Sequence, residues 1–140
     1  MTGEPRSTPR PRILCDTGSL SGAGDDATGA VWRLAEPGRQ LDANVVRIAP
    51  GRRVDTHTEP DLDVLLLVVA GEGTLVCLDG SEPLGPGTTA WLPHGSTRAL
   101  VAGAAGLSYL TVHRRRPGMR IQRLEGAGQA PALTGADEGV

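Results

Sequence analysis

The sequence contains neither lysine nor phenylalanine, and its only aromatic residues are two tryptophans and one tyrosine. All 14 basic residues are arginine, and 16 acidic residues bring the formal net charge to −2. A chain so close to neutrality lacks the dense positive charge that attracts nucleic acid or an anionic membrane. We therefore expect neither as a partner.

Cysteine and long apolar runs are also scarce. Cys15 and Cys77 are too few for a disulfide framework and do not form a Cys-x-x-Cys pair. Residues 64–70 form the longest unbroken apolar run, far short of the roughly 20 residues that span a bilayer. The Pro- and Arg-rich residues 1–12 have no apolar stretch typical of a signal peptide. These absences predict a cytoplasmic protein.

Glycine and proline are abundant instead, with 20 and 11 residues in a chain of 140. Such a turn-rich composition argues against a helical bundle or a coiled coil. Large apolar residues are sparse in 1–27 and in 124–140, so we expect a mobile N-terminal arm and a disordered C-terminal tail. The folded domain is predicted to span residues 28–123.

Short apolar runs separated by turn residues fill this domain, and none keeps a helical period. The Asp79-Gly80 pair between two runs predicts a hairpin, with positive φ at both turn positions. The pattern indicates an all-β sandwich or barrel. The predicted strands are residues 30–34, 41–48, 63–70, 74–78, 88–92, 97–101 and 107–113.

Residues 64–70 are apolar at every position rather than at alternate ones. A strand of this kind is covered on both faces. Either a second copy of the chain covers the outer face, which would make the protein a homodimer, or a second layer of the same chain does.

Three polar residues occupy alternate positions whose side chains are predicted to point into the barrel. If the chain is extended from residue 57 to 63, His57, Glu59 and Asp63 project from one face. An imidazole and two carboxylates at the open end of an apolar interior need pairing, hydrogen bonds or a metal. The residues that continue this face, and should fill the barrel, are Leu65, Leu67 and Val69.

Two segments carry a family resemblance. Gly51-x5-His57-x-Glu59-x3-Asp63-x7-Gly71 resembles the first signature of the cupin superfamily. Gly87-x5-Pro93-x-Gly95-x2-Arg98 resembles the second. The resemblance covers roughly residues 41–113 and implies the cupin fold, a jelly-roll or double-stranded β-helix barrel with a small ligand inside.

The departures from that family concern the metal ligands. Metal-binding cupins present His-x-His, then a Glu, then a His in the second motif, whereas this chain keeps only His57. Glu59 replaces the second His, Asp63 stands where the Glu would be, and Arg98 replaces the final His. A guanidinium has no accessible lone pair and cannot ligate a cation. We therefore predict a metal-free barrel mouth in which Arg98 pairs with Glu59 or Asp63, beside His57.

If a divalent metal does bind, the ligands His57, Glu59 and Asp63 favour Mn(II) or Fe(II). The first functional hypothesis is a small-molecule-binding cupin. Arg98 would grip an anionic group and His57 and Tyr109 would add hydrogen bonds. The apolar walls would come from Leu65, Leu67 and Trp91, although Trp91 also fits simple core filling.

The alternative hypothesis is an enzyme, because the resemblance allows a metal-dependent oxygenase or a metal-independent isomerase or cyclase. His57 would then be a metal ligand or a general base. A third hypothesis is an interaction protein that uses the arginines of residues 114–116, although a charge run of three residues is usually a solvated face. The roles of His94 and His113 stay open. His94 is expected to be exposed in a turn. His113 would be a substitute ligand if it faced the interior, although the alternation of Leu110 and Val112 favours the surface.

Overall fold

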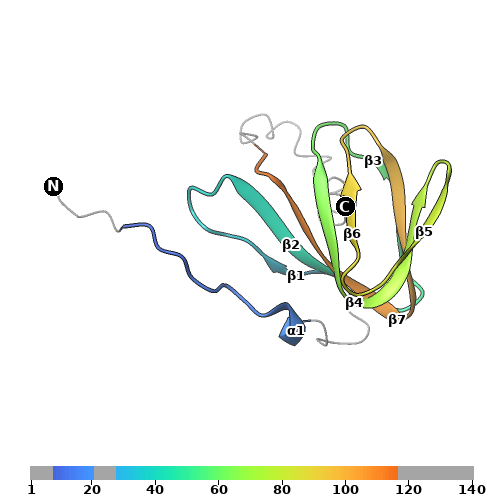
Figure 1. The fold of residues 1–140 in the computed structure, drawn as a ribbon, viewed down its shortest axis with the longest axis horizontal. Coiled ribbons are helices and arrows are strands. Elements are labelled where there is room, and N and C mark those ends of the chain that lie inside the picture. Colours follow the sequence, from blue (N-terminus) through green and yellow to red (C-terminus); the bar gives the residue numbers. More distant parts are fainter. Residues whose placement is uncertain (1–7, 21–27, 117–140) are drawn as a thin grey trace, which may run out of the picture.

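The computed structural model describes residues 8–20 and 28–116, and within them the chain is mostly antiparallel β-structure with almost no helix. The strands are hydrogen-bonded in the order β1-β2-β7-β4-β5, with β3 added to β7 and β6 added to β4. They curve around a common interior (Figure 1). The elements are α1 (Thr17–Leu20), β1 (Gly29–Arg33), β2 (Leu41–Ile48), β3 (Arg53–Thr58), β4 (Val64–Cys77), β5 (Gly80–Leu84), β6 (Thr89–Leu92) and β7 (Thr97–Arg114).

Two long strands, β4 and β7, pair with each other along most of their length. Near one end Leu65 lies opposite Val112, and near the other Cys77 lies opposite Arg98. The register shifts midway, where a Cβ on Gly71 would collide with the carbonyl group of Gly106. Glycine is therefore needed where the two backbones approach each other and bend. This bend merges the predicted strands 63–70 and 74–78 into β4, and 97–101 and 107–113 into β7.

Three elements were not predicted from the sequence: α1, β3 and β5. Both strands are mostly exposed and polar, so they lack the apolar alternation by which a strand is detected. The hairpin between β4 and β5 is confirmed, but its two turn residues are Leu78 and Asp79. The expectation of positive φ at Asp79 is wrong, since only the following Gly80 has one.

The residues of β4 that face the apolar core are the alternate set to the one that was expected. Val64, Leu66 and Val68 are buried in it, whereas Leu65 is 45% exposed. The prediction that Leu65, Leu67 and Val69 fill the barrel is therefore wrong. The error arises because β3 ends at Thr58 and contains a bulge between Val54 and His57, so alternation counted from residue 57 does not continue into β4.

The predicted domain boundaries are only partly covered by the described residues. Residues 1–7 and 21–27 of the expected arm, and residues 117–140, which include the expected tail, lie outside them. Their predicted mobility stays a prediction. Within the arm, α1 packs against β4.

Candidate functional site

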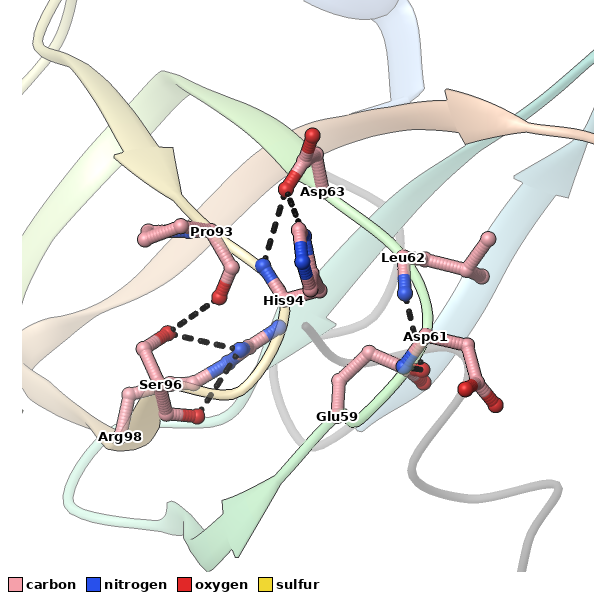
Figure 2. A network of polar contacts seen from close by, with 8 residues as sticks. All are labelled: Glu59, Asp61, Leu62, Asp63, Pro93, His94, Ser96 and Arg98. Carbon is pink, nitrogen blue, oxygen red and sulfur yellow. Dashed lines mark hydrogen bonds and ion pairs between the residues drawn. The ribbon is translucent and has the colours of Figure 1, made fainter.

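The side chain of Arg98 lies inside one end of the barrel. It is 2% exposed and projects from β7, where its neighbours across the sheet are His57 on β3 and Cys77 on β4. Its Nη1 donates to the carbonyl oxygen of Ser96 at 3.2 Å and to the Ser96 Oγ at 3.0 Å (Figure 2). The turn before β7 therefore holds this guanidinium in place.

The charge of Arg98 is under two opposing influences. Burial lowers the pKa of its guanidinium, and the negative charge of Glu59 acts in the opposite direction. An arginine stays protonated despite such a shift. The barrel end thus contains a buried cation, which is costly unless it is paired and hydrogen-bonded.

Glu59 is engaged through both carboxylate oxygens. Its Oε1 accepts a hydrogen bond from the Arg116 Nη2 at 2.6 Å, and its Oε2 accepts from the backbone N–H of Asp61 at 2.8 Å and of Leu62 at 3.2 Å. Burial by itself raises the pKa of Glu59, but the N–H of Asp61 and the Arg116 guanidinium outweigh it, so the pKa lies below its ordinary value. Glu59 therefore forms an ion pair with Arg116, and acts on Arg98 through its charge.

Asp63 lies on the outer surface, away from this cluster. Its Oδ1 accepts from the backbone N–H of His94 at 2.9 Å and lies 2.7 Å from the His94 Nδ1 (Figure 2). These two hydrogen bonds lower the pKa of Asp63, and the one from the backbone N–H of His94 contributes most. The expectation that Asp63 shares a face with His57 and Glu59 is wrong, because residues 59–63 form a loop rather than an extended strand. The exposure expected of His94 is confirmed.

The imidazole of His57 has a defined orientation. Its Nδ1 lies 3.0 Å from the carbonyl oxygen of Asp55, an acceptor only, so the neutral ring carries its proton on Nδ1. The Nε2 then holds the lone pair, and this buried atom has no hydrogen-bond partner in the described part of the chain. His57 is thereby prepared to accept a hydrogen bond or a proton through Nε2.

The second half of β7 contributes polar groups to the interior. Tyr109, Thr111 and His113 are buried, and Tyr109 belongs to the apolar core. The alternation that placed His113 on the surface is wrong, since Leu110 and Val112 share the outward parity. The Nδ1 of His113 donates to the carbonyl oxygen of Arg114 at 2.7 Å. Thr111 is 1% exposed, and its Oγ1 has no hydrogen-bond partner within residues 8–20 and 28–116.

Trp91 does not line the interior and does not fill the core. It is 60% exposed and lies beside Leu65 on the outer face, where β6 pairs with β4. The expected apolar walls from Leu65 and Trp91 are therefore wrong. Sequence reasoning considered Arg116 only within the arginine run 114–116 and did not connect it with Glu59. It missed Thr111, because a threonine within a strand carries no signal of its own.

The residues at the metal position of cupins do not fit a divalent cation. Arg98 brings a positive charge, both oxygens of Glu59 are already hydrogen-bonded, and Asp63 points outward. No group of three or more His, Cys, Asp or Glu side chains in residues 8–20 and 28–116 is arranged to hold a metal ion. His57, Glu59 and Asp63 therefore do not form a ligand set for a divalent cation, and the metal-free barrel mouth stays a prediction.

The curved antiparallel strands and the polar barrel end define a cupin-type double-stranded β-helix, and the predicted resemblance to the cupin superfamily is confirmed at the level of the fold. Among similar solved structures, a sugar phosphate isomerase of that superfamily from Silicibacter pomeroyi is 28% identical, with a TM-score of 0.51, over 56% of this chain and 53% of that one. A cupin superfamily protein from Desulfitobacterium hafniense is 21% identical, with a TM-score of 0.62, over 77% of this chain and 94% of that one.

The polyketide cyclase RemF from Streptomyces resistomycificus is 22% identical, with a TM-score of 0.53, over 59% of this chain and 60% of that one. The chain spans little more than half the length of the first similar structures. It matches no protein-family model and no curated protein. No helix within the described part of the chain is long and apolar enough to cross a membrane.

Proposed function

We propose that this chain binds a small organic anion inside the barrel, with Arg98 and His57 as the principal contacts. The observation that carries the proposal is the guanidinium of Arg98, 2% exposed at the end of an apolar interior. Burying a guanidinium there lowers the stability of the fold relative to an apolar side chain of similar size, so a role in binding is a reason to keep it. A planar guanidinium is suited to bidentate contact with a carboxylate or a phosphate.

His57 adds a second requirement for the ligand. Because its neutral Nδ1 donates to Asp55, its buried Nε2 is an acceptor. A ligand hydroxyl group next to the anionic group would satisfy it. Hydroxycarboxylates and sugar phosphates combine both features, and one similar structure is a sugar phosphate isomerase.

Isothermal titration calorimetry with a panel of small hydroxycarboxylates and sugar phosphates tests this proposal. The Arg98→Gln variant should lose at least about a hundredfold in affinity for any ligand found, since a buried charged contact is removed. Arg53→Gln is the matched control, because Arg53 is an exposed arginine on β3. Equal affinities of wild type and Arg98→Gln for the same ligand would show that Arg98 does not bind it.

A second function, a metal-independent isomerase or cyclase, is favoured by the orientation of His57. A buried lone pair on Nε2 is what a general base requires. His57→Gln should then abolish turnover while the melting temperature stays near the wild-type value and ligand affinity falls only by about tenfold, the loss of one hydrogen bond. Turnover that survives this substitution would exclude His57 as the base.

The proposed assembly is a homodimer formed through the outer sheet face. Leu65 and Trp91 are 45% and 60% exposed on adjacent strands, and apolar neighbours of this kind are typical of an interface. Trp91→Glu should turn a dimer into a monomer in sedimentation velocity. A wild-type monomer at micromolar concentration would contradict this assignment. The cytoplasmic location stays a prediction.

A further inference from the structure

The turn at residues 93–96 joins β6 to β7 and carries acceptors for the Arg98 side chain. The backbone N–H and the Oγ of Ser96 both donate to the carbonyl oxygen of Pro93, at 3.1 Å and 2.7 Å. The carbonyl oxygen and the Oγ of Ser96 accept hydrogen bonds from Arg98 Nη1. A displacement of this turn therefore moves two of the groups that hold the buried guanidinium.

The loop at residues 59–63 is attached to the same turn from the outside. The Gly95 N–H donates to the carbonyl oxygen of Glu59 at 2.7 Å. The Oδ1 of Asp63 accepts two more hydrogen bonds, from the backbone N–H of His94 at 2.9 Å and from its Nδ1 at 2.7 Å (Figure 2). One carboxylate oxygen on the outer surface thus supplies two of these three attachments.

The turn depends on these attachments for its position. The bonds from Ser96 to Pro93 lie within the turn, so they fix its shape but not its place relative to the loop. Gly95 has a φ of 86°, and glycine is the residue whose backbone is least restricted by itself. The pKa of Asp63 lies below its ordinary value, mainly because of the His94 N–H. The carboxylate is therefore ionised at neutral pH, which makes it a strong acceptor.

We propose that Asp63 and His94 are positioning residues, which hold the turn at residues 93–96 and thereby keep the Arg98 guanidinium in the orientation that binds the ligand. The inference deepens the proposed function and rests on it only for the effect on ligand affinity. It gives two residues of the outer surface a role at the barrel interior. The orientation matters because a bidentate contact with an anion requires a guanidinium that is held in place.

The test is proton–nitrogen NMR of the full chain, with the Arg98 guanidinium signal assigned by its loss in Arg98→Gln. Hydrogen bonds slow the rotation of a guanidinium group, so the wild type should give a sharp signal. Asp63→Ala removes both bonds from His94. The Arg98 signal should then broaden or vanish, and the Gly95 N–H should exchange with solvent at least about tenfold faster.

Asp63→Asn is the conservative variant that separates the hydrogen bonds from the charge. Its side-chain oxygen can still accept the backbone N–H of His94 and the Nδ1–H of the neutral ring. It should restore the sharp Arg98 signal, with Gly95 exchange within about twofold of the wild type. An Asn variant as loose as Asp63→Ala would contradict the assignment of these hydrogen bonds as the cause.

Asp42→Ala is the matched control for a general loss of stability. The Oδ1 of Asp42 also accepts from a basic side chain, the Arg39 Nε at 2.9 Å, but it lies on β2. This variant should leave the Arg98 signal and the Gly95 exchange rate unchanged. An equal change in Asp42→Ala would reduce the effect to general loosening and overturn the proposal.

An unmoved Arg98 signal in a folded Asp63→Ala variant would also overturn the positioning role. If Asp63→Ala does not fold, His94→Ala decides by the same two measurements. That variant removes the Nδ1 bond and keeps the backbone N–H of residue 94. An Arg98 signal and a Gly95 exchange rate that both equal those of the wild type would then refute the proposal.

Ligand affinity distinguishes this proposal from the proposed function. For any hydroxycarboxylate or sugar phosphate that needs Arg98, Asp63→Ala should weaken binding about tenfold and Asp63→Asn should restore it. Equal affinities of wild type and Arg98→Gln would refute the proposed function, and the NMR result would still decide the positioning role. Binding that is lost in Arg98→Gln, together with an unmoved Arg98 signal in Asp63→Ala, refutes only the positioning role.

Discussion

Replacing Thr111 by valine should stabilise this protein. The side chain is 1% exposed and its Oγ1 has no hydrogen-bond partner among the residues that the structure describes, so folding removes the hydroxyl from water without compensation there. Mutational data put the cost of such a group at about 1–3 kcal/mol. Valine has nearly the same shape and no hydroxyl, so we expect a gain of about 1 kcal/mol, which corresponds to about 4–8 °C in melting temperature for a domain of this size.

Urea denaturation with linear extrapolation measures this change directly. Thr88→Val is the matched control, because the Oγ1 of Thr88 accepts a hydrogen bond from the N–H of Gly85 at 3.2 Å. Its loss should cost about 0.5–1.5 kcal/mol. If Thr111→Val is as destabilising as Thr88→Val, the Thr111 hydroxyl has a partner and the reasoning is refuted.

Three other outcomes follow from the same contacts. Leu66→Ala should lower the free energy of unfolding by about 2–5 kcal/mol in urea denaturation, because Leu66 is fully buried; a loss below about 1 kcal/mol would contradict its place in the core. The depressed pKa of Glu59 stabilises the fold above its ordinary pKa, and this contribution is lost as pH falls through the folded pKa. Acid unfolding of Glu59→Gln should therefore be less steep, and a profile identical to wild type would exclude the contribution. Dialysis against a chelator should leave the melting temperature unchanged, and a drop would reveal a structural metal.

The fold was predictable because it depends on local patterns. Short apolar runs between Gly and Pro turns specify strands whatever their partners are. The Gly51 and Gly95 positions of the two motifs both have positive φ, a backbone requirement that the sequence displays directly. The strands β3 and β5 escaped prediction because exposed polar strands show no periodic burial.

The candidate site was only partly predictable. Arg98 and His57 were identified from motif spacing, and the structure places them opposite each other across β7 and β3. Asp63 and Leu65 were assigned to the interior by counting alternation through residues 59–63. Such a count is valid only where the chain is extended. Because residues 59–63 form a loop, the positions expected to face inward face outward after it.

The sequence by itself determined an all-β barrel, its turns, and the position of Arg98 in the second motif, since each depends on a residue and its near neighbours. The tertiary structure alone decided which face of β4 is buried, that Asp63 binds His94, and that Glu59 binds Arg116 57 positions away. Bulges and loops decide which face of a strand is buried, and ion pairs depend on which segments of the chain come together in space. Neither is encoded in local spacing.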